Sequence, residues 1–199
     1  MDELEKLRKH WEDDNFQRKH ALAREIVVNR LRELNREYEE KTGQGFVRFI
    51  ETRMKTPESI AEKLQRKDYD VDFDTAVTAL NDISGVRCIC YSVKEIYWIA
   101  RQIGKTDTYT VVKAKDYIRY ESYHIVLDIP MSYKGKTTVV RVELQLRTMI
   151  MDAWAGMDNR VSYKKGVPPE MERRIEKYAR IGRRLDKLIQ KTLDDSKTV

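Results

Sequence analysis

Cysteine and long apolar runs are scarce in this sequence. Only two of the 199 residues are cysteine, Cys88 and Cys90, and they lie too close along one strand-like segment to bridge each other. Without a partner histidine or cysteine the pair is also a poor metal site, which indicates a reduced compartment. No apolar run approaches the ~20 residues of a membrane span, and the first residues lack a signal-peptide pattern. We therefore expect a cytoplasmic protein with no membrane contact.

Glycine-rich phosphate loops are also missing. Neither Gly-x-x-x-x-Gly-Lys-Ser/Thr nor Gly-x-Gly-x-x-Gly occurs, so any nucleotide must be held by side chains. The three histidines, His10, His20 and His124, cannot form a metal triad at their spacing. These absences exclude the commonest glycine-loop and histidine-metal chemistries.

Charged side chains are plentiful, and the chain also has enough hydrophobic residues to form a core. Hydrophobic residues make up 41% of the chain, enough for one compact domain with helical extensions. Lysine and arginine total 39 against 33 aspartates and glutamates, which gives a net charge of +6. This modest excess favours anionic ligands without demanding nucleic acid.

Hydrophobic periodicity predicts an α+β (mixed α/β) fold. Helices are expected at residues 2–11, 15–42, 56–67, 93–103, 148–163 and 169–194, and strands at 85–93, 109–113, 123–129 and 137–147. Ser92 and Glu95 make a capping box, and Thr56-Pro57 is a typical helix start. The order of elements indicates a mixed sheet flanked by helices, with long N- and C-terminal helices.

Three parts are expected along the chain. Residues 1–45 form an N-terminal helical extension, residues 46–165 the central domain, and residues 166–199 a C-terminal helix. The last helix carries one broad apolar stripe of Ile175, Tyr178, Leu185, Leu188 and Ile189. We expect this stripe to pack on the domain, or alternatively to form an oligomer interface.

The segment 139–147 alternates strictly between apolar and polar residues. One face carries Val140, Val142, Leu144 and Leu146, and the other carries Arg141, Glu143, Gln145 and Arg147. A solvent-washed face is the ordinary interpretation of such a strand. A catalytic face requires a second acidic residue close by.

Asp82 is the candidate for that second carboxylate, because it directly precedes the strand at 85–93. Two carboxylates on adjacent strands can hold magnesium, or divide into one metal ligand and one base. The alternative for Asp82 is a turn cap, for which aspartate is well suited. His124 either reaches the face of Glu143 or caps the edge of the sheet.

A basic cluster precedes Asp82 in the sequence. It consists of Arg53, Lys55, Lys63, Arg66 and Lys67. Such cations can hold phosphates by charge-assisted hydrogen bonds, and arginine can also stack on a base. The alternative is a solvated helix face.

Six ordered motifs together resemble a known family. They are Arg53-Met-Lys55-Thr-Pro-Glu-Ser59-Ile, Asp82-Ile-Ser-Gly-Val-Arg87, Lys115-Asp-Tyr-Ile, Tyr120-Glu-Ser122-Tyr-His124, Val142-Glu143-Leu-Gln145-Leu-Arg147-Thr148 and Met151-Asp-Ala-Trp154-Ala. Over residues 46–164 the chain resembles the synthetase domain of the RelA/SpoT family, and most of all its stand-alone small alarmone synthetases. The resemblance implies a nucleotidyltransferase-like fold. It also implies transfer of pyrophosphate from ATP to the ribose 3′-hydroxyl of GDP or GTP, which gives AMP and the stringent-response alarmone (p)ppGpp.

The same resemblance implies roles for individual residues. Arg53 and Arg87 would sandwich the adenine. The ATP phosphates would be lined by Lys55, Ser59, Lys63 and Arg66. Asp82 would hold magnesium, and Glu143 would accept the hydroxyl proton or share the metal. Tyr120 would stack on guanine, and the acceptor would be placed by Lys113, Lys115, His124, Gln145 and Arg147. A homotetramer is implied as well, with RNA at most as a regulator.

Three departures from the family pattern concern the acceptor side. The family has a loop containing Pro-Lys-x-Asn-Gly where only Arg119 separates Ile118 from Tyr120. We expect a mobile loop that these 199 residues omit, since ligand-gripping loops are often disordered when empty, whereas a genuine deletion puts guanine binding in doubt. Glu121 stands where a basic or neutral residue is usual. Asp158-Asn159 replaces a frequent Glu-His, so the role of that histidine does not carry over.

Two rival functions remain open. One is a toxic relative that pyrophosphorylates tRNA or makes an adenosine alarmone. The chain's mild positive charge, with no basic-aromatic interleaving, disfavours it. The other is an inactive RNA-binding module, against which the presence of both Asp82 and Glu143 argues.

Overall fold

The computed structural model describes residues 2–118, 122–133, 135–162 and 168–196. Its helices are α1 (Glu3–Trp11), α2 (Asp14–Thr42), α3 (Pro57–Gln65), α4 (Phe73–Ala79), α5 (Val93–Gln102), α6 (Met149–Ser162) and α7 (Pro169–Asp195). Its strands are β1 (Val47–Met54), β2 (Ser84–Cys90), β3 (Thr110–Tyr117), β4 (Ser122–Tyr133) and β5 (Lys136–Thr148). The predicted α+β class is confirmed.

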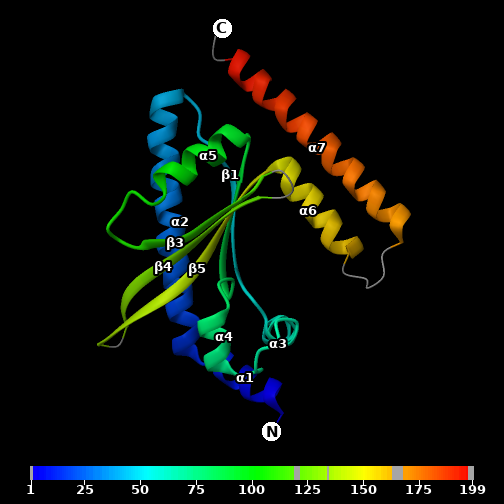
Figure 1. Ribbon diagram of the computed structural model, residues 1–199. Helices are drawn as coiled ribbons and strands as arrows, with labels where there is room; N and C mark the ends of the chain where they lie inside the picture. Colours follow the sequence, from blue (N-terminus) through cyan, green and yellow to red (C-terminus); the bar gives the residue numbers. More distant parts are fainter. Residues whose placement is uncertain (1, 119–121, 134, 163–167, 197–199) are drawn as a thin grey trace.

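The five strands form one mixed sheet in the order β1-β2-β5-β4-β3 (Figure 1). β2 and β5 lie parallel, and every other neighbouring pair is antiparallel. Because β2 and β5 are parallel neighbours, the chain between them must cross back over the sheet. α5 and the β3–β4 pair make up this crossing.

The main core lies between the sheet and the long helix α2, with α5 beside it (Figure 1). Val142, Leu144 and Leu146 of β5 are fully buried there, together with Leu31 and Leu34 of α2. The alternation predicted for β5 therefore directs its apolar face onto α2. The opposite face is left for Arg141, Glu143, Gln145 and Arg147.

A second, smaller core gathers α1, α3 and α4 at the N-terminal end of the molecule (Figure 1). Leu7 and Trp11 of α1 meet Ile60 and Leu64 of α3 in this cluster. Thr56 caps α3 by accepting from the Ser59 amide, with proline at the first helical position as predicted. The cluster fixes α3 next to the end of β1.

Helix ends follow the sequence signals. The capping box of Ser92 and Glu95 is present at the start of α5. Gly43 ends α2 with φ of 78°, a left-handed conformation that glycine adopts without strain. Cys88 and Cys90 are buried free thiols, as expected.

Two elements were not predicted, β1 and α4. β1 is an edge strand whose buried and exposed residues do not alternate, so it lacks the two-residue period used to recognise strands. α4 has only seven residues, too few for a helical period to stand out. In the central region the sequence therefore predicted one strand and one helix fewer than the fold contains.

Two further predictions need correction. Tyr178, Leu185 and Leu188 of α7 are 42–55% exposed, so most of the predicted stripe does not pack on the domain. The prediction of an omitted mobile loop is also wrong, because the chain is continuous and Tyr117 pairs directly with Ser122. Tyr120, Glu121 and the segment 165–167 lie outside the described residues. Among those described, no helix is long and apolar enough to cross a membrane.

Candidate active site

Strand register brings the predicted site residues into two rows across the sheet. The first row is Glu51, Arg87, Gln145, His124 and Lys115, and the second is Arg53, Gly85, Glu143, Val126 and Lys113. Side chains in such rows lie on one face, because they are cross-strand partners. Residues far apart in the sequence thus share the face that α2 leaves uncovered.

Asp82 lies at the head of β2 and is held by two lysines. Its Oδ2 accepts from Lys55 Nζ at 2.8 Å and from Lys63 Nζ at 2.6 Å. The Asp82 side chain is only 11% exposed, and no donor among the described residues reaches its Oδ1. Burial alone would raise the pKa of Asp82, but the two lysines outweigh burial and lower it. Asp82 is therefore an ionised carboxylate, and one of its oxygens is buried without a partner among the described residues.

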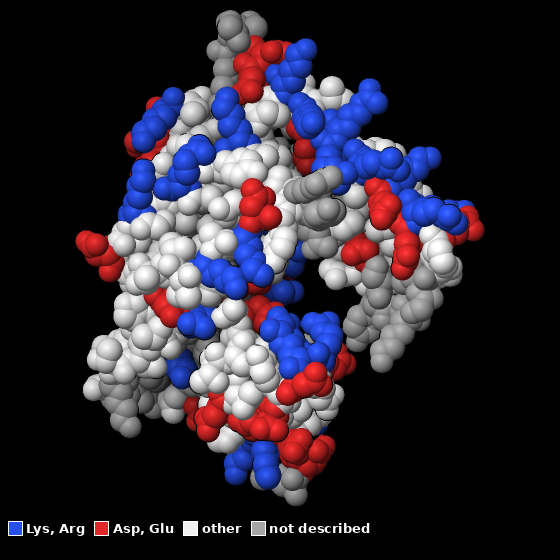
Figure 2. Space-filling model, in the orientation of Figure 1, with Lys and Arg blue, Asp and Glu red and all other residues white. Residues whose placement is uncertain are grey.

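Local structure explains why Lys55 and Lys63 meet at Asp82. The Lys55 amide donates to the Ile83 carbonyl at 2.8 Å, which extends the pairing of β1 with the chain beside Asp82. Lys63 lies on α3, which the second core fixes there. Figure 2 shows Lys and Arg side chains gathered over α3, beside a hollow between α3 and α6.

Ser59 and Arg66 lie at opposite ends of α3. Ser59 is in the first turn, where its amide donates to Thr56 Oγ1, and helix N-termini attract anions. Arg66 is the C-cap residue and is exposed, one helix length away from Ser59. Of the predicted phosphate-binding residues, the structure brings Lys55 and Lys63 together and leaves Arg66 at the margin.

Glu143 of β5 is held by one neighbour on β4 and one on its own strand. Its Oε1 lies 3.2 Å from His124 Nδ1, and its Oε2 accepts from Gln145 Nε2 at 2.7 Å. His124 Nε2 lies 2.6 Å from Ser122 Oγ. An imidazole that donates from Nδ1 to Glu143 fits both contacts. His124 therefore reaches the face of Glu143, the first of its two predicted alternatives.

The pKa of Glu143 is lowered despite its burial. Burial of this 14% exposed side chain raises the pKa, as does the charge of Asp82, but the hydrogen bond and positive charge of His124, together with the hydrogen bond from Gln145, outweigh both. Because the charge of Asp82 raises the pKa of Glu143, the two carboxylates lie close enough to repel each other. Glu143 is thus ionised and oriented, with its lone pairs directed by fixed partners.

The two predicted adenine-binding arginines lie on neighbouring strands. Arg53 of β1 pairs with Gly85 of β2, and its side chain lies over that glycine. A Cβ added to Gly85 would lie 3.4 Å from Arg53 Cγ. Arg87 Nη1 bonds Glu51 Oε2 at 3.2 Å and approaches Asp152 Oδ1 at 3.5 Å. Because Gly85 has no side chain, the Arg53 stem can lie flat against the sheet.

A small cavity of about 120 Å³ lies at the other end of the rows, toward β3. Its lining includes Lys113, Lys115, Tyr117, His124 and Glu143. Lys115 Nζ lies 5.6 Å from the centre of the Tyr117 ring, and that ring meets His124 edge-on at 5.4 Å. The predicted acceptor residues on β3 and β4 therefore surround one hollow beside Glu143. Tyr120 lies outside the described residues.

Two supporting residues were not predicted from the sequence. Arg141 binds both Asp128 oxygens, at 2.7 and 2.9 Å, and donates to Asn81 Oδ1 at 3.0 Å, so it fixes the residue before Asp82. Asp152 of α6 accepts from Arg147 at 3.2 Å and also approaches Arg87. Neither contact has a signal in the sequence beyond the charge itself, because each depends on tertiary packing.

A metal would find few protein ligands at this site. The described residues contain no group of three or more His, Cys, Asp or Glu arranged to hold a metal ion. Magnesium, however, is often held by one or two carboxylates together with substrate phosphates and water. The unbonded Oδ1 of Asp82, with Glu143 nearby, fits that limited protein contribution.

Known proteins share this arrangement along most of the chain. Residues 52–167 match the family described as "Region found in RelA / SpoT proteins". GTP pyrophosphokinase YwaC from Bacillus subtilis (strain 168) is 28% identical over 94% of this chain and 91% of its own.

Two solved structures of small alarmone synthetase 1 from Bacillus subtilis superpose on the fold. One is bound to its product pppGpp, with a TM-score of 0.81 and 28% identity over 94% of this chain and 98% of that one. The other is bound to AMPCPP, with a TM-score of 0.79 and 27% identity over 96% and 100%. The family match covers more than half of the sequence and contains Asp82, Glu143 and the strands that carry them, so this chain belongs to the RelA/SpoT family.

Proposed function

We propose that this chain is a (p)ppGpp synthetase that transfers pyrophosphate from ATP to the 3′-hydroxyl of GDP or GTP, releasing AMP. The observation that carries the proposal is that Asp82, held by two lysines, and Glu143, held by a histidine, lie close enough for the charge of Asp82 to raise the pKa of Glu143. Relatives named GTP pyrophosphokinase, and a relative bound to pppGpp, support the same activity.

Arg53 and Arg87 are proposed to hold the adenine of ATP between their guanidinium planes. Arg53 already lies across Gly85, beside the strand that carries Arg87. A base entering there competes with Glu51 and Asp152 for Arg87, which is 23% exposed and can turn. A relative bound to an ATP analogue supports an adenine nucleotide as donor.

Lys55 and Lys63 are proposed to exchange Asp82 for the ATP phosphates. Both ammonium groups form charge-assisted bonds that a phosphate oxygen can replace. Ser59 at the start of α3 and Arg66 at its end extend this phosphate-binding surface. Release of the lysines frees Asp82 Oδ2, so both oxygens of this carboxylate become available to magnesium.

Asp82 and Glu143 are proposed to hold the magnesium ion, which when bound neutralises negative charge on the phosphate oxygens. Glu143 accepts a hydrogen bond from the attacking 3′-hydroxyl and then its proton. Its lowered pKa keeps it ionised before substrate arrives, while His124 and Gln145 fix its orientation. Positioning and charge, which dominate phosphoryl-type transfers, are thereby supplied by side chains.

The acceptor nucleotide is proposed to lie over the hollow beside β3. Lys113 and Lys115 contact its phosphates, and His124, Gln145 and Arg147 border its ribose, with Tyr120 stacking on the guanine. Because Ile118 to Glu121 is the whole link between β3 and β4, few residues can close over the base. We therefore expect weaker guanine recognition than a long loop provides.

We propose a cytoplasmic homotetramer, with RNA at most as a regulator. The exposed apolar residues of α7, Tyr178, Ile181, Leu185 and Leu188, support contact with another subunit. Residues 1–45, 46–165 and 166–199 are the proposed helical extension, synthetase domain and C-terminal helix. The free thiols and the nucleotide substrates support a location in the cytoplasm.

The test supplies pure protein with magnesium, γ-labelled ATP and, separately, GDP, GTP or tRNA. We expect labelled 3′-pyrophosphorylated guanosine and an equal amount of AMP, and no labelled tRNA. Product from none of the acceptors would remove the enzyme proposal, and label in tRNA alone would replace it with the toxic relative. Glu143→Gln serves as the control for contaminating activity.

A further inference from the structure

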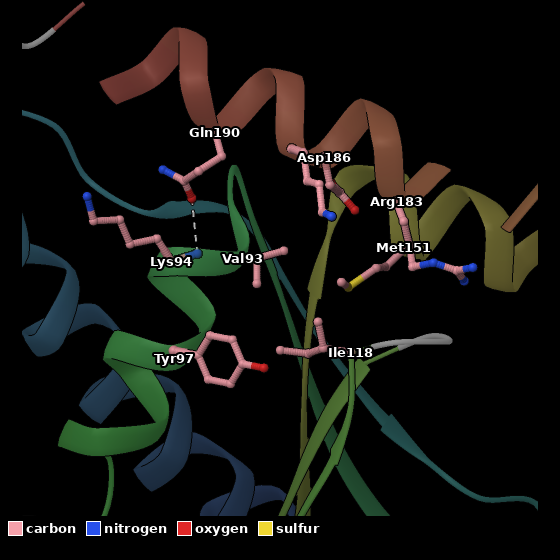
Figure 3. A pocket seen from close by; sticks show the side chains of 9 residues that line it. Val93, Lys94, Tyr97, Ile118, Met151, Arg183, Asp186 and Gln190 are labelled. Carbon is pink, nitrogen blue, oxygen red and sulfur yellow. Dashed lines mark hydrogen bonds between the residues drawn. The ribbon is translucent and has the colours of Figure 1, made fainter. Parts of the chain in front are cut away.

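A cavity lies away from the candidate active site, beneath α7. It measures about 530 Å³ and lies between α5, α6, α7 and the end of β3 (Figure 3). Pockets of roughly 300–1,000 Å³ are the size that takes small organic ligands. Nothing in the proposed pyrophosphate transfer uses this space.

Apolar side chains and one aromatic ring form most of its walls. Val93, Ile118 and Met151 line it, and Figure 3 shows Tyr97 and Ile118 on the side opposite α7. The Tyr97 hydroxyl donates to Asp116 Oδ2 at 2.8 Å, which holds the half-exposed ring in place. A fixed aromatic face of this kind favours a flat aromatic partner.

A buried carboxylate of α7 breaks the apolar lining. Asp186 is only 4% exposed, and its Oδ1 has no donor among the described residues. Burial raises the pKa of Asp186, and a hydrogen bond with Thr148 offsets this in part. Because a buried acceptor without a donor costs free energy, a ligand N–H or O–H would satisfy it.

Of the other polar groups around the cavity, two are committed to partners. The Lys94 ammonium binds Asp194 at 3.0 Å, and Gln190 accepts from the Lys94 amide at 3.1 Å. Lys187, next to Asp186, is exposed and also lines the cavity. Arg183 lines the cavity as well, so the cations around the cavity favour a ligand with an anionic end.

We propose that this cavity binds a small aromatic anion that carries an N–H or O–H donor. Its ring lies against Tyr97 and the apolar wall, its donor reaches Asp186 Oδ1, and its anionic group meets Lys187. A fatty acid anion has neither the aromatic ring nor the N–H or O–H donor. A metal ion would find only one carboxylate among the residues that line the cavity. The proposal does not depend on the proposed synthetase activity.

The probe 8-anilinonaphthalene-1-sulfonate combines aromatic rings, one N–H and one sulfonate. Titrated into the full chain, it is expected to bind at one molecule per chain with blue-shifted emission. Saturating AMPCPP should leave that signal unchanged, because the nucleotide binds on the other face of the sheet. Displacement by AMPCPP that is equally strong in Asp186→Asn would place the probe in the active site and overturn the proposal.

Two variants separate this cavity from the exposed apolar face of α7. Asp186→Asn should bind the probe about tenfold more weakly, since bonds to a charged acceptor are roughly twice as strong as neutral ones. Its melting temperature should not fall, because the buried carboxylate is itself costly. Lys187→Gln should weaken binding about threefold, with Lys191→Gln, one helical turn away, unchanged. Equal binding by all variants, or several molecules per chain, would refute the cavity as the site.

Competition identifies the source of the natural ligand. Guanosine 5′-monophosphate and indole-3-acetate both have a ring, an N–H and an anionic group. Displacement of the probe by the first indicates a nucleotide, and by the second an aromatic acid, and either supports the proposal provided that Asp186→Asn weakens the competitor as well as the probe. If neither displaces it at millimolar concentration, the assigned ligand class is wrong.

Discussion

Asp82→Asn should bind an ATP analogue more tightly than the unsubstituted protein when no metal is present. In the empty site Lys55 and Lys63 both donate to Asp82 Oδ2. A phosphate must therefore compete with this carboxylate and also approach its negative charge. Asparagine has the same shape without the charge, so both lysines become available to phosphate.

The size of the effect follows from the two ion pairs. Hydrogen bonds to charged groups contribute about 1.5–3 kcal/mol each. The lysine side chains are 20% and 23% exposed, and amide contacts replace part of the loss, so we take the lower end for the pair together. A gain of about 1.5 kcal/mol corresponds to roughly tenfold tighter binding.

Calorimetric titration of AMPCPP in EDTA measures this directly. Asp74→Asn is the matched control, because it removes the same charge from an exposed position in the first turn of α4. Asp82→Asn should also lose turnover with magnesium, so binding and catalysis move in opposite directions. Binding equal to or weaker than that of the control would refute lysine exchange.

Three other outcomes are expected. Glu143→Gln should abolish turnover in the labelled-ATP assay while AMPCPP affinity stays within about twofold, and retained activity would remove Glu143 from the mechanism. Gly85→Val should raise the KM for ATP about threefold to tenfold by pushing Arg53 off the sheet, since an added Cβ already lies 3.4 Å from Arg53 Cγ, and an unchanged KM would argue against adenine stacking there. Burial lowers the pKa of His20 to about 3, so below pH ~6.5 the unfolded state binds a proton that the folded state excludes. His20 alone should then lower the free energy of unfolding by about 1.4 kcal/mol per pH unit down to pH 3, and urea titrations of His20→Gln should show a dependence on pH that is flatter by that amount.

Elements with a regular hydrophobic pattern or a local capping motif could be predicted from the sequence. β5 alternates strictly because one face packs on α2, so its polar residues could be assigned to one face from the alternation alone. The cap of α5 could also be predicted, since Ser92 and Glu95 form hydrogen bonds with each other's backbone within one turn of helix. The sequence alone offered Asp82 and Glu143 as a pair, but the pattern around Asp82 fits a turn cap equally well, and the family resemblance decided for the pair.

Contacts made across the fold could not be predicted. Lys55 reaches Asp82 only because β1 pairs with β2, and β1 has no alternating pattern. Arg141 looked like a surface residue, but its contacts with Asp128 and Asn81 depend on the register of β4 and β5. For α7 the sequence left packing on the domain and an oligomer interface open, since periodicity shows that a face is apolar but not what covers it.

The empty site keeps its main cations paired with carboxylates that substrates can replace. Lys55 and Lys63 share Asp82, and Arg87 lies between Glu51 and Asp152. These pairs hold the side chains near their proposed working positions, at the cost of competing with phosphate and base. Each nucleotide that binds therefore releases a carboxylate, and at Asp82 the released group is the proposed metal ligand. Donor binding and metal binding should accordingly reinforce each other, with the metal-free affinity gain in Asp82→Asn as the direct measure of that competition.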